Sequence, residues 1–356
     1  MADLAPPPTT KVSDVITSFR PTKQFKTSTP VSYTSIDHDD SGEFLLLSRT
    51  DDTIQMYNTK AGAPAKELKS QKYGSALARF THHSQSIIYA STKGDDAIRY
   101  LSMHDNNFIR YFRGHEGRVT SLCLSPSGDQ FMSSSLDGTV KLWDHRSSSA
   151  QGELRFEDPW LTAYDPSSTV FAVASPTAQA VVLYDLKNFD KPPFATFDLA
   201  DVEKRYVHLG QRPAEGWTGL EFGNNGKFLL ITTNGGGHYL LDAFSGDLVH
   251  YLHKSSGNGV TSRLAPGDPR PDPTSVYTQA DACLSPDGRF VIGGSGSQSG
   301  LVVWDSQDSS GVDKVLKPSA DLPSAKSAAV VAYNPRFNLL ASADKDVLLW
   351  LPDGDL

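Results

Sequence analysis

The amino-acid sequence predicts an all-β fold, a seven-bladed β-propeller that is closed by a strand from its N-terminus. Three observations lead to this fold. A unit of short strands, separated by Gly, Pro, Asn, Asp and Ser turns, recurs seven times along the 356 residues. The unit spacing is close to the ~40–45 residues that one propeller blade needs. The last unit lacks its outer strand, and the N-terminal segment can supply one.

The clearest unit runs from Gly114 to Asp144. It holds three apolar strand patterns, of which the first two are joined by a Ser-Pro-Ser-Gly turn and the last ends in Trp143 followed by Asp144. A second copy surrounds Cys283 and also ends in a Trp-Asp dipeptide, at Trp304. One such sheet cannot bury both of its faces alone, so the repeat predicts a radial ring of stacked sheets.

The aromatic or aliphatic residue near the end of the third strand marks each unit. These anchor residues are Tyr57, Leu101, Trp143, Tyr184, Leu241, Trp304 and Trp350. The intervals between them are 44, 42, 41, 57, 63 and 46 residues, so four of the six lie at or near the blade period. The two long intervals predict loop-like insertions at residues 199–216 and 254–278. An aspartate stands six residues before the anchor in four units, as at Asp137, which supports the same register.

The two ends of the chain predict how the ring closes. Residues 351–356 are too few for an outer strand after the last anchor, whereas residues 20–25 precede the first inner strand just as residues 109–112 precede the third. We therefore expect residues 20–25 to complete the last blade, which leaves no sheet edge open there. Residues 19–356 then form a single propeller domain, and the Pro/Thr-rich residues 1–18 are expected to be disordered.

Composition excludes several classes of function. With 33 basic and 41 acidic residues the net charge is −8, which disfavours general electrostatic attachment to nucleic acid or anionic membranes. No apolar run approaches the ~20 residues of a membrane span, and no secretory signal precedes the first unit. The two cysteines, Cys123 and Cys283, occupy equivalent positions of different units and cannot form a disulfide. We expect no cofactor and no metal site.

Several stretches resemble a known family. The residues Gly114, His115, Asp137 and the two Trp-Asp dipeptides resemble the repeat of WD40 proteins. More specific similarity lies at residues 72–74, 95–102, 104–106, 109–112, 193–197 and 217–220. These resemble the WD-repeat subunit shared by SET-domain histone H3 lysine-4 methyltransferase complexes (COMPASS) and the mRNA cleavage and polyadenylation factor. The resemblance extends from about Phe19 to Pro352.

The resemblance implies a non-catalytic scaffold that acts in the nucleus, on chromatin and in mRNA 3′-end processing and transcription termination. Its implied partners are an N-terminal segment of the SET-domain methyltransferase catalytic subunit and, separately, the scaffold subunit of the phosphatase module of the polyadenylation factor. An alternative is a phosphopeptide reader that binds the RNA polymerase II tail mainly through a basic rim. No direct contact with nucleic acid or membranes is expected.

The first candidate site is a set of polar residues in the third unit. It consists of His115, Ser133 or Ser135, Asp137 and Trp143. Ser, His and Asp together invite a hydrolase interpretation, but no Gly-x-Ser-x-Gly elbow accompanies them. The WD-repeat resemblance implies instead a structural hydrogen-bond network inside the blade, so we expect no catalytic residue.

The second candidate site is a basic rim formed by Arg99, Arg110, Arg113 and Arg118. These arginines can be a solvated surface that pairs with nearby acids, or they can recognise an acidic or phosphorylated peptide, since guanidinium groups bind phosphate through two hydrogen bonds. Arg113 and Arg118 flank a loop and are the stronger candidates, whereas Arg99 and Arg110 lie within predicted strands. The resemblance favours the phosphopeptide interpretation.

Overall fold

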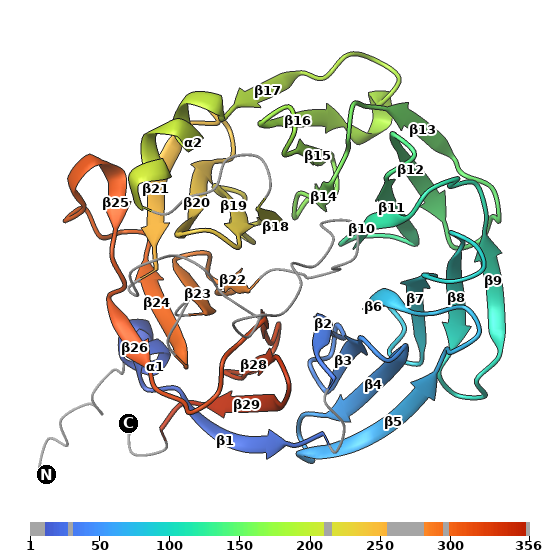
Figure 1. Ribbon diagram of the computed structural model, residues 1–356, viewed down its shortest axis with the longest axis horizontal. Coiled ribbons are helices and arrows are strands. Elements are labelled where there is room, and N and C mark those ends of the chain that lie inside the picture. Colours follow the sequence, from blue (N-terminus) through green and yellow to red (C-terminus); the bar gives the residue numbers. More distant parts are fainter. Residues whose placement is uncertain (1–10, 28–30, 210–215, 255–280, 295–298, 354–356) are drawn as a thin grey trace, which may run out of the picture.

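The computed structural model describes residues 11–27, 31–209, 216–254, 281–294 and 299–353. Seven sheets stand around a central axis like the blades of a propeller (Figure 1). Six of the sheets have four strands and one has five. The predicted seven-bladed propeller is therefore confirmed.

The first four blades are antiparallel meanders, in which the first strand lies nearest the axis and each following strand lies farther out. Blade 1 contains β2 (Tyr33–His38), β3 (Phe44–Arg49), β4 (Thr53–Asn58) and β5 (Ala63–Lys69). Blade 2 contains β6 (Ala76–Phe80), β7 (Ser86–Ala90), β8 (Ile98–Ser102) and β9 (Phe108–Phe112). Blade 3 contains β10 (Val119–Leu124), β11 (Gln130–Ser135), β12 (Thr139–Asp144) and β13 (Gly152–Arg155). Blade 4 contains β14 (Leu161–Tyr164), β15 (Val170–Ser175), β16 (Ala180–Asp185) and β17 (Ala195–Asp198), with a short helix η1 (Leu186–Asn188) after β16.

The remaining three blades depart from the simple meander. Blade 5 contains β18 (Trp217–Phe222), β19 (Phe228–Thr233), β20 (Gly237–Asp242) and β21 (Leu248–His253), and β25 (Val315–Leu316) joins it as a fifth, parallel strand. Blade 6 contains β22 (Ala282–Leu284), β23 (Phe290–Gly294), β24 (Leu301–Asp305) and β26 (Ala320–Leu322), with η3 (Val312–Lys314) before β25. Blade 7 contains β27 (Val330–Tyr333), β28 (Leu340–Ala343) and β29 (Val347–Leu351), and β1 (Arg20–Phe25) completes it.

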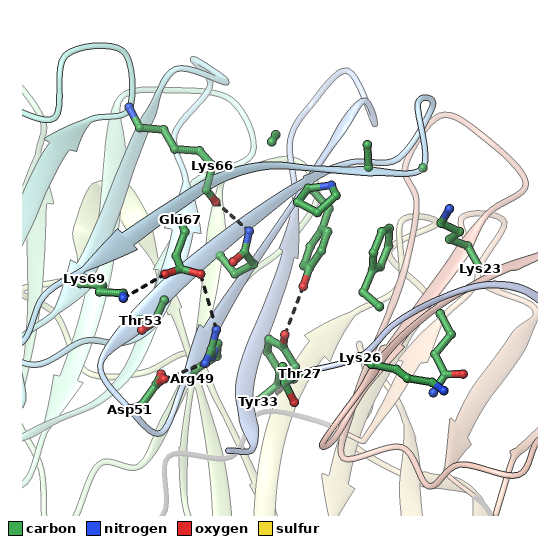
Figure 2. A pocket seen from close by; sticks show the side chains of 18 residues that line it. Lys23, Lys26, Thr27, Tyr33, Arg49, Asp51, Thr53, Lys66, Glu67 and Lys69 are labelled. Carbon is green, nitrogen blue, oxygen red and sulfur yellow. Dashed lines mark hydrogen bonds and ion pairs between the residues drawn. The ribbon is translucent and has the colours of Figure 1, made fainter. Parts of the chain in front are cut away.

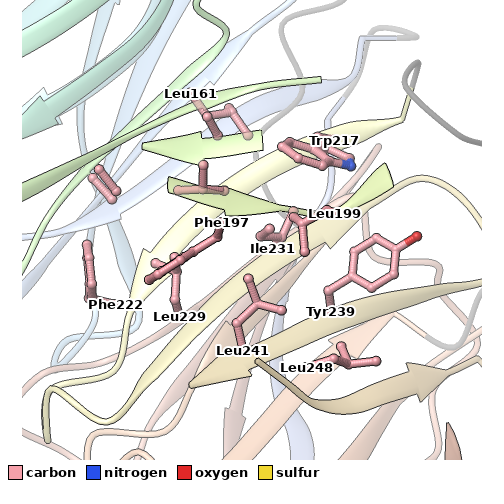
Figure 3. Packing of buried hydrophobic residues seen from close by; sticks show 14 of the residues in the cluster. Leu161, Phe197, Leu199, Trp217, Phe222, Leu229, Ile231, Tyr239, Leu241 and Leu248 are labelled. Carbon is pink, nitrogen blue, oxygen red and sulfur yellow. The ribbon is translucent and has the colours of Figure 1, made fainter. Parts of the chain in front are cut away.

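Apolar side chains fill the spaces between neighbouring blades. Successive residues of a strand point to opposite faces of its sheet, so each blade sends side chains toward both of its neighbours. Between blades 4 and 5, for example, Phe197 packs with Trp217, Ile231 and Leu241 (Figure 3). Because both faces of each sheet are covered, the middle strands are almost entirely buried, as in β7.

The N-terminal strand closes the ring. Strand β1 pairs antiparallel with β29, from Arg20 opposite Leu351 to Phe25 opposite Val347. The sequence prediction of this closure is thus confirmed. The expected disorder of residues 1–18 does not hold for Val12–Thr17, which form helix α1. Residues 1–10 lie outside the described part of the chain.

Helix α1 is ordered because two apolar side chains attach it to the ring. Ile16 and Phe19, three residues apart, are 2% and 0% exposed and pack in the cluster that contains Trp350. Ser18 also accepts a hydrogen bond at its carbonyl oxygen from the backbone N–H of Asp353, 3.2 Å away. The N-terminal segment is therefore held on both sides of Phe19.

The insertion predicted at 199–216 is helical rather than loop-like where it is described. It begins with α2 (Ala200–Tyr206), which continues into η2 (Val207–Leu209). Glu203 is buried and accepts a hydrogen bond from the Trp217 indole at 2.6 Å, while the Tyr206 ring stacks on Tyr251 at 4.2 Å between centroids. These contacts attach α2 to blade 5.

The second predicted insertion, at 254–278, lies outside the described residues except for Lys254. The Lys254 ammonium is fully buried and lies 2.8 Å from a carboxylate oxygen of Asp281, the first described residue after the insertion. A buried ion pair therefore joins the two ends of this insertion. No helix in the described ranges is long and apolar enough to cross a membrane.

Candidate functional site

The predicted polar set of blade 3 forms one connected network. His115, from the turn before β10, lies 2.9 Å through Nδ1 from the Asp137 carboxylate and 2.7 Å through Nε2 from Ser133 Oγ. The Trp143 indole N–H donates to the same Ser133 oxygen at 2.8 Å. Ser135 lies outside this chain, since its hydroxyl donates to the Gly117 carbonyl at 2.7 Å. Of the two serines considered from sequence, Ser133 is the one in the network.

The network has the order of contacts of a hydrolase triad, but its surroundings favour a structural role. Ser133 is 0% exposed, and its hydroxyl oxygen is already engaged by His115 and Trp143, so a substrate has no access to it. Burial lowers the pKa of His115, which the adjacent Asp137 carboxylate opposes. Burial would raise the pKa of Asp137, but hydrogen bonds from Thr139, Glu116 and His115 lower it to about 2. The polar groups satisfy one another within the blade.

Of the predicted basic rim, Arg99 is buried and already paired. Its guanidinium donates two hydrogen bonds to the Asp95 carboxylate, at 2.8 and 3.0 Å, and stacks 3.7 Å from the centroid of the Tyr73 ring. The side chain is only 1% exposed. Arg99 therefore positions Tyr73 and Asp95 and does not present its charge at the surface.

Arg99 and Arg110 lie on opposite faces of blade 2. In the register between β8 and β9, Arg99 faces Tyr111, and the next residue, Tyr100, faces Arg110. Arg110 consequently points toward blade 3, where it lines a pocket of about 390 Å³ together with His82, His83, His145 and Arg146. The structure therefore divides the predicted rim between two surfaces.

The remaining two arginines flank the turn between β9 and β10, as the sequence predicted. Arg113 is exposed, and its guanidinium lies 5.2 Å from the centroid of the Tyr111 ring. Arg118 is half-buried at the start of blade 3. Arg113 shares the blade 1 side of the sheet with Arg99, whereas Arg110 does not.

An aromatic patch lies beside Arg113 on the outer edge of blade 2. Phe108 lies between the rings of Tyr73 and Tyr111, with centroid distances of 6.1 and 5.2 Å. Phe108 and Ile109 are 37% and 48% exposed, which is high for large apolar side chains. Tyr73, Arg99 and Tyr111, from three of the stretches that carried the family resemblance, thus lie together on one face of blade 2.

A groove between blades 7 and 1 was not predicted from the sequence. It has a volume of about 900 Å³ and is lined by β1 on one side and β5 on the other (Figure 2). At its floor the hydroxyls of Tyr33 and Tyr57 lie 3.2 Å apart, and the Phe25 ring lies 4.3 Å from that of Tyr57. Only the closure of the ring brings residues 23–27 beside residues 49–69, so no local motif could have revealed the groove.

The described residues offer no assembled metal site. Within those ranges, no three His, Cys, Asp or Glu side chains are grouped so that they could share an ion. Cys123 and Cys283 are free thiols on the innermost strands of blades 3 and 6. Burial raises the pKa of both thiols, which disfavours the reactive thiolate form.

Comparison with known proteins identifies relatives along almost the whole chain. The family "WD domain, G-beta repeat" matches residues 106–144. WD repeat-containing protein 82 of Drosophila melanogaster is 37% identical over 346 residues, which cover 97% of this chain and 98% of that protein. Set1 complex component swd2 of Schizosaccharomyces pombe is 35% identical, covering 95% of this chain and 98% of the relative. COMPASS component SWD2 of Saccharomyces cerevisiae is 34% identical, covering 95% of each. The chain belongs to the WD-repeat family that includes WD repeat-containing protein 82 and SWD2.

Proposed function

We propose that this protein is a non-catalytic scaffold subunit of a COMPASS-type complex that methylates lysine 4 of histone H3. The observation that carries the proposal is similarity over nearly the full length of both chains to a Set1 complex component and a COMPASS component. The buried Ser133 supports a structural rather than catalytic role for the one triad-like set. A ring with pockets between its blades is suited to hold short segments of larger subunits.

The proposed partner in this complex is the N-terminal segment of the SET-domain catalytic subunit, and the proposed location is the nucleus. We further propose a second assembly, in which the protein binds the scaffold subunit of the phosphatase module of the cleavage and polyadenylation factor. That assembly would link it to mRNA 3′-end processing and transcription termination. The support for the second assembly is the sequence resemblance at residues 72–74, 95–102, 104–106, 109–112, 193–197 and 217–220.

Affinity purification of the tagged full-length chain from its own cells, followed by mass spectrometry, tests both assemblies. We expect to recover a SET-domain methyltransferase and, as a separable set, polyadenylation subunits. Recovery of neither would overturn the assignment. Recovery of the methyltransferase alone would confirm the first assembly and refute the second.

A second candidate function is recognition of the phosphorylated RNA polymerase II tail. The specific observation in its favour is the exposed Arg113 beside Tyr111 and Phe108, a combination that can hold a phosphate and an adjacent apolar side chain. The double variant Arg113→Ala with Arg118→Ala should reduce binding of a Ser-phosphorylated tail peptide. Arg155→Ala, an exposed arginine of β13, serves as the control. Unchanged binding by the double variant would assign these arginines to a solvated rim.

A further inference from the structure

We infer that the groove between blades 7 and 1 docks an extended, acidic segment of a partner protein. The inference rests on the proposed scaffold function, because it specifies the chemistry of one segment that the scaffold holds. Three features of the groove carry it: its charge, its aromatic floor and the strand edge beside it (Figure 2).

The groove is basic although the whole chain is acidic. Five basic residues line it, Lys23, Lys26, Arg49, Lys66 and Lys69, against two acidic residues, Asp51 and Glu67, while the chain carries a net charge of −8. Both acids already have partners, since Arg49 lies 2.7 Å from Asp51 and 3.9 Å from Glu67, and Lys69 lies 3.5 Å from Glu67. An incoming acidic segment therefore meets positive charge that the groove itself does not neutralise.

Two lysines on the β1 side are the principal candidates for contacting the segment. Lys23 and Lys26 are exposed at the rim of the groove, and Lys23 lies 5.9 Å from the Phe25 ring. Lys66, on the opposite side, donates to the backbone carbonyls of Met103 and His104 and so directs its ammonium toward blade 2. The charge available to a ligand is thus concentrated at Lys23 and Lys26.

The floor of the groove offers an apolar contact between the charges. The half-buried Phe25 ring packs against Tyr57, and the Tyr57 hydroxyl is engaged with that of Tyr33. The aromatic faces can therefore cover an apolar side chain of the segment, while the lysines bind its carboxylates. This arrangement favours a peptide with both acidic and apolar residues over a free anion.

The edge of β5 favours an extended conformation for the segment. Strand β5 is the last strand in the order of blade 1, so its outer edge carries backbone groups that an added strand can pair with. Blade 5 demonstrates such an addition, because β25 joins the outer edge of β21 with Tyr251 opposite Val315 and Leu252 opposite Leu316. The outer edge of a blade in this ring therefore accepts a further strand.

A peptide-binding titration tests the inference. The probe is a fluorescein-labelled peptide of about ten residues in which glutamate alternates with leucine, the length of one extended strand. A second probe carries glutamine at each glutamate position. We expect the glutamate probe to bind the full-length chain roughly tenfold more tightly than the glutamine probe, with affinity that falls as salt is added. Equal affinity for the two probes would overturn the inference.

Matched charge reversals locate the binding. Lys23→Glu with Lys26→Glu should weaken binding of the glutamate probe roughly tenfold. Lys187→Glu with Lys191→Glu makes the same change of charge at exposed lysines of blade 4 and should leave binding unchanged. Equal weakening by the two variants would mean that net charge alone drives binding and would overturn the inference. Thermal unfolding of both variants confirms that each remains folded.

Co-purification separates this inference from the proposed function. Suppose that the wild-type chain recovers the methyltransferase, but the glutamate probe binds the Lys23→Glu, Lys26→Glu variant as tightly as the wild type. The groove assignment then fails and the scaffold function stands. If the probe requires both lysines but the chain recovers no methyltransferase, the proposed complex fails and the acidic-segment site stands.

Discussion

Removal of residues 1–27 should unfold the propeller, because this segment supplies both a strand and two core side chains. The deletion removes β1 and leaves the outer edge of β29 unpaired. It also removes Ile16 and Phe19, which are 2% and 0% exposed in the cluster around Trp350. The ring then lacks the closure that protects its sheets.

The expected loss can be estimated from the two buried side chains. Truncating a buried isoleucine costs about 2–5 kcal/mol, and truncating a buried phenylalanine about 3–5 kcal/mol. Losing both approaches the ~5–15 kcal/mol by which a typical domain is stable, before the lost pairing of β1 is considered. We therefore expect the truncated chain to be unfolded or aggregated at ordinary temperatures.

Thermal and urea unfolding, followed by circular dichroism, would measure this effect. The milder variant Phe19→Ala should lower the unfolding free energy by about 3–5 kcal/mol. Val12→Ala removes an exposed apolar group from α1, in the same N-terminal segment, and should change the unfolding free energy by less than about 0.5 kcal/mol. A truncated chain that unfolds at the same midpoint as the full chain would refute the closure argument.

Three further predictions concern polar groups that are buried or half-buried in the ring. Ser133→Ala removes the hydrogen-bond partner of His115 Nε2 and the acceptor of the Trp143 indole N–H, so it should lower the unfolding free energy in urea by about 2–4 kcal/mol. A loss below ~0.5 kcal/mol would refute the structural role of the network. Asp281→Asn removes the carboxylate that pairs with the buried Lys254 ammonium, so it should lower the unfolding free energy in urea by about 3–5 kcal/mol. An unchanged unfolding free energy would contradict this prediction. Burial raises the pKa of Glu221 from 4.5 to about 7, because the folded chain favours the protonated carboxyl. This contribution to stability is fully present below pH 4.5 and is lost as the pH rises through 7. Glu221→Gln should therefore raise the thermal midpoint more at pH 8 than at pH 5, and an equal change at both pH values would refute the assignment.

The fold could be predicted from the sequence because its information is local and repeated. Each blade carries its own turn residues and its own anchor, so errors in one unit do not disturb the count. The closing strand at residues 20–25 could be predicted because the last unit lacks an outer strand. Helix α1 was missed because the prolines and threonines of residues 1–10 dominated the composition, although Ile16 and Phe19 had the spacing of a buried helical face.

The candidate sites were predictable only where one repeat contains them. The members of the blade 3 network lie in a single unit, so their spacing indicated their contact. To predict where the arginines lie, the register between β8 and β9 must be known. A bulge next to Tyr100 sets this register, which places Arg99 and Arg110 on opposite faces of the sheet. The groove at Lys23 and Lys26 could not be predicted from any single unit, because it forms only when the ring closes. Surfaces formed between blades are therefore less visible in sequence than networks formed within one.

The tryptophans show that the blades satisfy their indole groups in different ways. All five indole N–H groups in the chain donate a hydrogen bond, but to different acceptors. These pairs are Trp143 with Ser133, Trp350 with Ser342, Trp304 with the His253 carbonyl, Trp217 with Glu203, and Trp160 with the Trp217 carbonyl. A buried indole needs an acceptor, and any element that reaches it can provide one. In blade 5 that acceptor comes from α2, so this insertion helix is part of the propeller's own hydrogen bonding, and its removal should destabilise the ring rather than merely shorten a loop.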